Sequence, residues 1–188
     1  GRYKDREKYL EECLATTDTL EKMVQELLTI SRLDMPDCAC NKIELDLSSL
    51  INESLSSHED LFVLKNLTVE RFISPDISVL GDMRLLQKAV DNLLGNAAAY
   101  SPAGNRIIVK LWRDEDGAKL TIENTGVHIP KEEIPRLFEA FYRVERSRNR
   151  QTGGTGLGLY IVKSILDLHG AKIWIENSDN GVIALVQI

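Results

Sequence analysis

The chain has 188 residues, of which 43% are apolar and 28% charged, so one globular domain with an appendage is expected rather than a disordered chain. Its net charge of −6 disfavours a general nucleic-acid binder, and no run of about eighteen apolar residues predicts a transmembrane helix. Three cysteines without zinc-type spacing fit a reducing compartment, and Cys38 and Cys40 are interpreted as part of an inert linker rather than a metal or redox site.

A long helix is predicted from about residue 5 to residue 33. Apolar or small residues recur in it at alternating spacings of three and four: Leu10, Cys13, Thr17, Leu20, Val24, Leu27 and Ser31. Such a heptad seam packs either against another helix in a bundle or onto the helix's own domain. Pro36 ends the helix, and residues 36–41 are predicted to form a linker.

Strand and helix patterns then alternate as far as residue 80. A strand is predicted over residues 42–47, and Ser48 or Ser49 is expected to cap a helix that runs to about Leu64. Further strands are predicted over residues 67–73 and 77–80.

The next helix opens near Asp82 and carries Asn92 and Asn96 one turn apart on one face. An amide oxygen can ligate a hard cation such as Mg²⁺, and amide hydrogens can bind phosphate oxygens. Taken alone, such a pair is more often an ordinary solvated face.

Two hairpins complete the predicted elements. The first joins residues 105–113 to 119–124, and the second joins residues 173–176 to 182–188, with a helix over residues 157–168 between them. The predicted fold is therefore α/β, a two-layer sandwich in which helices pack on one face of a mixed sheet.

Four motifs occur in a fixed order along this part of the chain: Asp91–Pro102, Ile122–Pro130, Leu137–Arg143 and Gly153–Leu159. The series resembles the N box, first glycine box, F box and second glycine box of the ATP-binding domain of bacterial sensor histidine kinases. The resemblance runs from about Asp46 to the end of the chain, and the first glycine box looks like that of vancomycin-resistance (VanS)-type sensors. It implies the Bergerat ATP-binding fold of the GHKL superfamily.

The resemblance also implies a site for ATP and Mg²⁺. Asn96 would bind the metal, Asn92 would contact phosphate or the hydrated metal, and Arg143 would be a cation of the lid that covers the phosphates. These three are the residues expected to be catalytic. The residues expected to contact the nucleotide are Asn92, Asn96, Tyr100, Asn124, Gly126, Ile129, Phe138, Tyr142, Arg143, Gly154, Thr155, Gly156, Leu157, Gly158 and Leu159.

Three positions depart from the family's pattern. Asn124 stands where an Asp usually accepts a hydrogen bond from the adenine amino group, so weaker adenine binding is expected. His128 replaces a glycine and is less free to adopt a positive φ. Ala99 stands where a phosphate-binding cation is common, a loss for which the basic segment with Arg146, Arg148 and Arg150 can compensate. Residues 143–154 are expected to be mobile without nucleotide, because they offer little apolar surface to bury.

The predicted organisation has three segments. Residues 1–35 correspond to the second helix of a dimerisation bundle, residues 36–41 to a linker, and residues 42–188 to the catalytic ATP-binding domain. The chain begins without Met and is expected to be a fragment whose first bundle helix, with the phosphorylatable His, lies upstream. The resemblance implies that the γ-phosphoryl of Mg-ATP passes to that His and then to an Asp of a response regulator, within a homodimeric membrane sensor of which this is a cytoplasmic part.

Two other functions stay open at this point. Asn124, His128 and Ala99 are compatible with a catalytically silent nucleotide-binding scaffold. A hydrolytic ATPase of the same superfamily is disfavoured, because the amide of Asn92 cannot accept a proton from water. His58 lacks the sequence of an acceptor motif and is interpreted as a surface helix residue, and His169 as structural. The isolated chain is therefore expected to bind Mg-ATP without acquiring stable phosphate.

Overall fold

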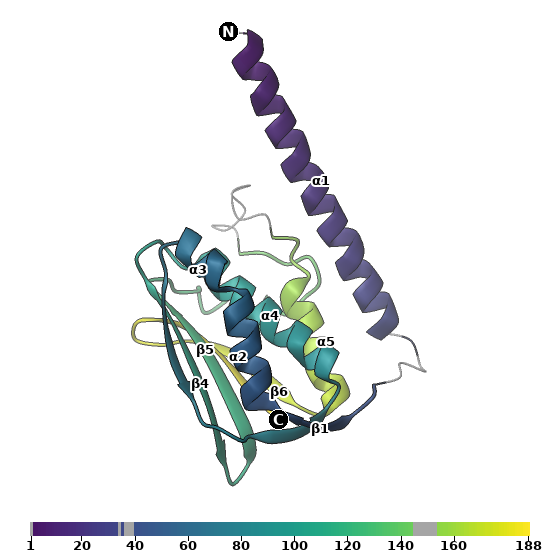
Figure 1. The fold of residues 1–188 in the computed structure, drawn as a ribbon, viewed down its shortest axis with the longest axis vertical. Coiled ribbons are helices and arrows are strands. Elements are labelled where there is room, and N and C mark those ends of the chain that lie inside the picture. The colour runs from purple at the N-terminus through teal and green to yellow at the C-terminus, as the bar shows by residue number, and fades with distance from the viewer. Residues whose placement is uncertain (1, 34, 36–39, 145–153) are drawn as a thin grey trace.

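The computed structural model describes residues 2–33, 35, 40–144 and 154–188. The elements are α1 (Arg2–Leu33), β1 (Ile43–Asp46), α2 (Leu47–Ser57), α3 (Glu59–Leu64), β2 (Thr68–Ile73), β3 (Ser78–Gly81), α4 (Met83–Tyr100), β4 (Arg106–Asp114), β5 (Gly117–Thr125), the 3₁₀ turn η1 (Ile134–Arg136), α5 (Gly158–His169), β6 (Lys172–Asn177) and β7 (Gly181–Gln187). Five strands form a sheet in the order β2-β4-β5-β7-β6, and the helices α2, α4 and α5 lie on one side of it (Figure 1).

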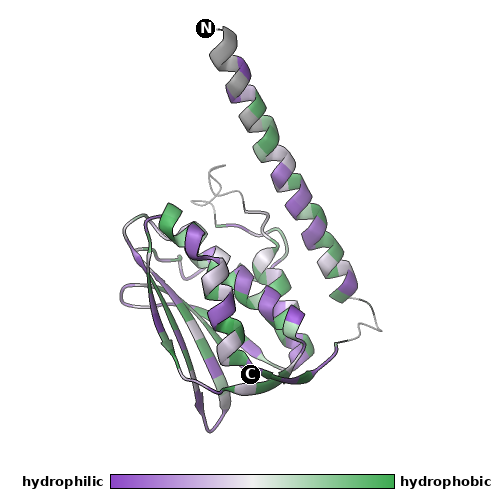
Figure 2. Cartoon of the chain, viewed as in Figure 1, coloured by the Kyte–Doolittle hydropathy of each residue, from purple (hydrophilic) through white to green (hydrophobic). Residues whose placement is uncertain are grey.

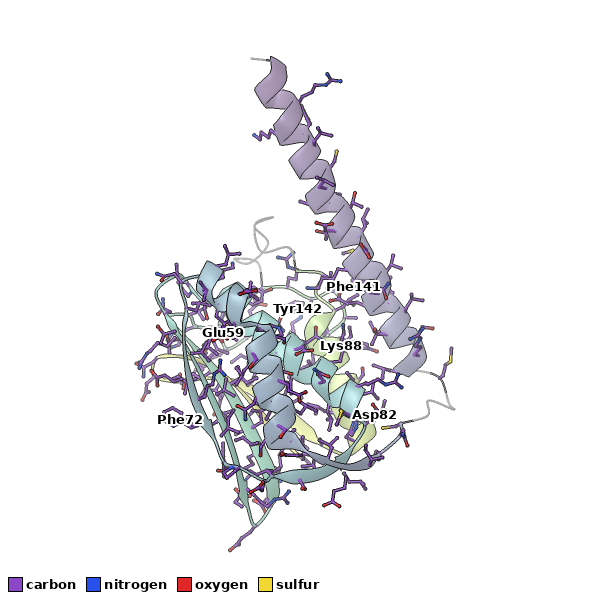
Figure 3. All side chains as sticks on the ribbon, in the orientation of Figure 1. Glu59, Phe72, Asp82, Lys88, Phe141 and Tyr142 are labelled. Atoms are coloured by element: carbon purple, nitrogen blue, oxygen red, sulfur yellow. The ribbon has the colours of Figure 1, made fainter. Side chains whose placement is uncertain are left out.

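The sheet is mixed, as predicted. β2 pairs in parallel with β4, whereas β4–β5, β5–β7 and β6–β7 pair antiparallel, so both expected hairpins are present. Strand residues alternate between the two faces of a sheet. Phe72 on β2 is more than half exposed and lies on the side away from the helices (Figure 3). The predicted two-layer α/β sandwich is confirmed.

One hydrophobic cluster joins the helices to the sheet. α4 contributes its buried stripe at helical spacing, α5 contributes a second stripe, and the inward positions of β4 and β5 close the layer between them. The fully buried members with the largest side chains include Leu86, Leu94, Ile107, Leu111, Ile161 and Ile165. Because the core-facing stripe of α4 is packed, its opposite face is free to present Asn92 and Asn96.

The helix α4 begins near Asp82, as predicted, and Asp82 is its cap. Its carboxylate accepts hydrogen bonds from the backbone N–H groups of Arg84 and Leu85, both at 3.1 Å, which caps the helix. The backbone N–H of Asp82 donates to Nε2 of His169 at 2.9 Å, and Nδ1 of His169 lies 2.7 Å from the carbonyl oxygen of Ile165. His169 thus ties the end of α5 to the start of α4, which agrees with its interpretation as structural.

Three details of residues 42–81 differ from expectation. The cap of α2 is Asp46, not Ser48 or Ser49, because Ser48 is buried and bonds Ser74 and Ile77 instead. The single helix expected to reach Leu64 is interrupted at His58, which divides it into α2 and α3. β1 pairs with β3 in a separate two-stranded sheet.

The long helix α1 extends well beyond the sandwich (Figure 1) and is apolar in patches along its exposed length (Figure 2). Seam residues Leu10, Leu20 and Val24 expose 63, 57 and 53% of their surface. Its last turns pack on the domain, where Leu33 is buried and Ile30 is partly buried. No helix in the described part of the chain is long and apolar enough to cross a membrane. The predicted boundaries at residues 35 and 41 stay predictions, since residues 34 and 36–39, with Cys38, lie outside the described residues.

Candidate functional site

A cavity of about 560 Å³ opens between α4, the end of β5, the start of α5 and the loop that precedes α5. Its volume is in the range of pockets that bind small molecules. Most residues predicted to contact a nucleotide line it: Asn92, Asn96, Tyr100, Asn124, Gly126, Ile129, Tyr142, Arg143, Gly154, Thr155, Gly156, Gly158 and Leu159. The four motifs therefore converge on one site.

The two amides of α4 face the first residue of α5. A Cβ atom placed on Gly158 would lie 3.2 Å from Oδ1 of Asn92 and 3.7 Å from Oδ1 of Asn96. The Nδ2 of Asn92 donates to the carbonyl oxygen of Lys88 at 2.8 Å, which orients that side chain along the helix. Two neutral amide oxygens beside a helix N-terminus make a suitable lining for a hard cation and its anionic ligand.

We call residues 154–158 the glycine end of the cavity. Gly156 has φ +77°, and a Cβ there would come within 2.7 Å of the Phe141 backbone, so only glycine fits. The N–H of Phe141 donates to the carbonyl oxygen of Gly156 at 2.9 Å. Thr155 Oγ1 accepts a hydrogen bond of 3.2 Å from the N–H of Leu157, at the start of α5. Tyr142 and Arg143 line the cavity beside this segment.

We call residues 124–129 the sheet end. Asn124 is buried in β5, and Gly126, with φ +81°, donates its N–H to the carbonyl oxygen of Asn180 at 2.8 Å. Nε2 of His128 lies 3.0 Å from the carbonyl oxygen of Ser178. His128 is absent from the described residues with positive φ, so the restriction expected at this replaced glycine does not arise.

A double hydrogen bond fixes the next residue of the sheet end. The N–H of Ile129 donates to Oδ1 of Asn177 at 2.8 Å, and Nδ2 of Asn177 donates to the carbonyl oxygen of Ile129 at 2.7 Å. Asn177 ends β6, so this loop is attached directly to the sheet. Below it, Leu137, Ile175 and Val182 form a second small hydrophobic cluster that is part of the cavity wall.

Two predicted contact residues do not line the cavity. Leu157 is fully buried and faces the core, and Phe138 packs against both hydrophobic clusters. Both residues belong to the predicted motifs, but their side chains pack in the hydrophobic clusters next to the cavity rather than in its lining. Of the predicted basic residues, Arg146, Arg148 and Arg150 lie outside the described residues, as does most of the segment expected to be mobile.

None of the motifs includes two charged lining residues, and both of these come from α1. Lys22 and Glu26 lie one turn apart and reach the cavity beside Thr155. Neither belongs to the heptad seam, and 129 residues separate Glu26 from Thr155. No local pattern in the sequence marks such a contact. The burial of Glu26 on an otherwise exposed helix is visible only in the structure.

The remaining candidate groups are away from the cavity. His58, expected on the helix surface, is partly buried at the α2–α3 junction, with Nδ1 2.8 Å from the carbonyl oxygen of Ser54. Cys40 Sγ lies 3.7 Å from Nε2 of His169, which already accepts the N–H of Asp82. Among the described residues, no three His, Cys, Asp or Glu side chains gather as a metal site.

Comparison with known proteins agrees with these motifs. Residues 81–186 match the family described as histidine kinase-, DNA gyrase B-, and HSP90-like ATPases. The chain belongs to this family. Among curated proteins, it is 34% identical over 97% of its length to the sensor protein VanSB of Enterococcus faecalis, of which it spans 41%.

Solved structures place the chain more closely within this family. The catalytic domain of histidine kinase ThkA, in a nucleotide-free form, superposes with a TM-score of 0.71 at 29% identity, over 79% of this chain and 95% of that one. ThkA in complex with the response regulator protein TrrA has a TM-score of 0.79 at 26% identity, over 96% of this chain and 50% of that one. The chain is thus an ATP-binding catalytic domain of the histidine kinase type, and the resemblance inferred from the four motifs is confirmed.

Proposed function

We propose that the cavity binds Mg-ATP with the adenine at the sheet end and the phosphates at the glycine end, and that the γ-phosphoryl group is transferred to a histidine of the longer protein. The observation that carries this proposal is the arrangement of the Asn92 and Asn96 amide oxygens opposite Gly158 at the start of α5. That arrangement combines cation ligands with a helix N-terminus, which suit the metal and the phosphates of a metal–triphosphate respectively.

Each residue has a specific part in the proposal. Asn96 ligates Mg²⁺, whose charge offsets that of the phosphates, and Asn92 contacts phosphate or the hydrated metal. Asn124 accepts a hydrogen bond from the adenine amino group, through a neutral oxygen and therefore more weakly than a carboxylate would. Arg143 supplies a cation that Ala99, also in the cavity wall, does not. Moderate nucleotide affinity follows from these two substitutions.

The fate of the phosphoryl group follows from chemistry in the cavity. Hydrolysis needs a base to accept a proton from water, and the amide of Asn92 cannot act as one near neutral pH. Transfer to an imidazole needs no such base, because a neutral imidazole nitrogen is itself nucleophilic.

The acceptor is placed outside this chain because its histidines are all engaged. His58 is beside Ser54, His128 is bonded at Ser178, and His169 links two helices. The chain spans about two fifths of the VanSB relative, so a longer protein has room for the acceptor. In that protein we place a bundle that dimerises through the exposed seam of α1, a membrane-anchored sensor region, and relay to a response-regulator Asp. The ThkA–TrrA complex supports the last partner.

Three measurements test the proposal. ATP titration should give tighter binding with Mg²⁺ than with a chelator present. Incubation with ATP labelled in the γ-phosphate should leave the isolated chain unlabelled. Addition of a two-helix bundle fragment that carries the acceptor His should then yield acid-labile phosphohistidine on that fragment, slowly, because docking is no longer intramolecular.

Other outcomes identify the alternatives. Binding without any labelling of the bundle would indicate a nucleotide-binding scaffold. Sustained release of inorganic phosphate by the isolated chain would indicate a hydrolytic ATPase, and acid-labile phosphate on His58 would overturn the assignment of the acceptor.

A further inference from the structure

Glu26 is in an unusual environment for a residue of α1. Among the α1 residues whose side chains are described, only Glu26 and Leu33 are buried, and Glu26 exposes just 3% of its surface. The helix therefore leaves several leucines in solvent while it buries a carboxylate. Burial of a charged group is unfavourable unless it is hydrogen-bonded or paired, so this arrangement needs a specific partner.

That partner is Thr155 at the glycine end of the cavity. The Thr155 hydroxyl donates a hydrogen bond to Oε2 of Glu26, and Oγ1 of Thr155 in turn accepts a hydrogen bond from the N–H of Leu157. Thr155 exposes only 6% of its surface, so the contact is shielded from solvent. The carboxylate thus lies beside the first turn of α5, where unpaired N–H groups and the helix dipole favour an anion.

Glu26 and a bound nucleotide need the same region. Glu26 lines the same cavity as Asn92, Asn96 and Gly158, which are the residues proposed to hold the metal and phosphates. Like charges repel strongly where water is excluded. Lys22 and Arg143, which also line the cavity, offset part of this repulsion, but they attract both anions alike.

We propose that Glu26 is a built-in anionic competitor of the nucleotide, so that docking of α1 on the glycine end and binding of ATP oppose each other. The inference deepens the proposed function and rests on it. Leu33 and Ile30 keep the last turns of α1 attached to the core, while Glu26, two turns earlier, engages or releases Thr155. A change in the bundle that withdraws α1 would thereby admit nucleotide, and bound nucleotide would free α1.

The test compares two acidic residues of one helix. Glu26→Gln removes the charge but keeps an oxygen that can accept the Thr155 hydroxyl. Glu21→Gln makes the same change in net charge on an exposed residue that does not line the cavity. Mg-ATP affinity is measured for both by displacement of a fluorescent ATP analogue, and thermal unfolding checks that each variant is folded. We expect roughly tenfold tighter binding for Glu26→Gln, within the usual range of coupling between sites, and a change below about twofold for Glu21→Gln.

A second measurement needs no variant. Because coupling is reciprocal, saturating Mg-ATP should speed amide hydrogen exchange in residues 22–33 of the wild-type chain, while amides at the start of α5 become slower. Glu26→Gln should remove most of the nucleotide effect on residues 22–33.

The outcomes separate the two proposals. If the wild-type chain binds Mg-ATP but Glu26→Gln binds it equally or more weakly, or if residues 22–33 become more protected with nucleotide, the competition is overturned and the ATP site stands. If no folded variant binds Mg-ATP, the proposed function fails and the competition fails with it.

Discussion

The two ends of the cavity are built in different ways. At the sheet end, the backbone of Gly126 and Ile129 and the imidazole of His128 are bonded to Asn180, Asn177 and Ser178 of the β6–β7 hairpin. At the glycine end, α4 lies alongside, and the hydrogen bonds include one from Phe141, one within the segment itself, and one to Glu26 on a separate long helix.

The two ends therefore differ in whether their geometry depends on the docking of α1. Strand pairing across β5, β7 and β6 fixes the sheet end whether or not α1 is docked. The geometry of the glycine end depends on a contact that a movement of α1 would remove. Under the proposed function, the base-binding region would always be formed, and the phosphate-binding region would respond to the position of α1.

The largest effect is expected at Asn96, which faces Gly158 at the glycine end. Asn96→Ala removes the proposed metal ligand and should weaken Mg-dependent ATP binding by on the order of 100-fold, while Asn96→Asp places an added charge beside the phosphates and should also abolish the Mg²⁺ effect. The fold should survive, because α4 is held by its opposite, buried face. Calorimetric titration with and without Mg²⁺ measures the change.

Asn52→Ala is the matched control, since it makes the same substitution at an exposed helical position that does not line the cavity. Mg-ATP affinity that is equal in Asn96→Ala and in the wild type would move the metal site elsewhere in the cavity.

A pair of glycine substitutions tests the difference in rigidity directly. A Cβ on Gly181, opposite the sheet end, would lie 2.0 Å from the carbonyl oxygen of Asn124, whereas a Cβ on Gly154 would meet its nearest neighbour, Oη of Tyr100, at 3.4 Å. Gly181→Ala should therefore lower the free energy of unfolding by about 1–3 kcal/mol, and Gly154→Ala should change it by less than about 0.5 kcal/mol. Urea denaturation measures both, and equal losses would show that the ends are equally constrained.

Much of this arrangement was predictable from local patterns. The start of α4 near Asp82, the Asn pair and both hairpins follow from periodicity and turn residues, which act over a few positions. The break at His58 was not predicted, because no Gly or Pro marks it. The Asp46 cap was missed because Asp46 also continues an alternating strand pattern.

The features that could not be predicted depend on distant contacts. One is the pairing of β1 with β3 apart from the main sheet, and another is the Glu26–Thr155 bond. In both, the local sequence of one segment contains no pattern that predicts its contact with the other. Phe138 and Leu157 show a related limit, since a motif identifies a neighbourhood but not the direction of each side chain.

A smaller effect is expected from Asn177, which attaches the sheet end to β6. Asn177→Ala removes both hydrogen bonds to Ile129, and a loss of about 1 kcal/mol should weaken ATP binding roughly fivefold. Asn177→Asp keeps the acceptor for the Ile129 N–H but cannot donate to its carbonyl, so an intermediate loss is expected. The ATP affinity of each variant is compared with that of Asn180→Ala, a control at an exposed neighbouring residue. If Asn180→Ala weakened ATP binding as much as Asn177→Ala, the role assigned to Asn177 would be contradicted.

The smallest effect should come from the far end of β5, where Asp114 and Lys119 pair at the β4–β5 turn. The hydrogen bond from Lys119 lowers the pKa of Asp114 below its ordinary 3.8, and the same bond raises the pKa of Lys119 above its ordinary 10.5. A lowered carboxyl pKa contributes stability above pH 3.8 that is lost as the pH falls through the folded value. A raised amine pKa contributes stability below pH 10.5 that is lost as the pH rises through the folded value.

Asp114→Asn keeps an oxygen for the N–H of Asp116 and removes only the charge, so the turn should persist. Its urea midpoint should fall slightly below that of the wild-type chain at pH 7. The difference should diminish as the pH falls below 3.8, and it should shrink in high salt, because the pair is partly exposed to solvent. ATP affinity should not change, since Asn124 lies at the other end of the strand. An altered affinity in Asp114→Asn would mean that the sheet end is less independent than its hydrogen bonds indicate.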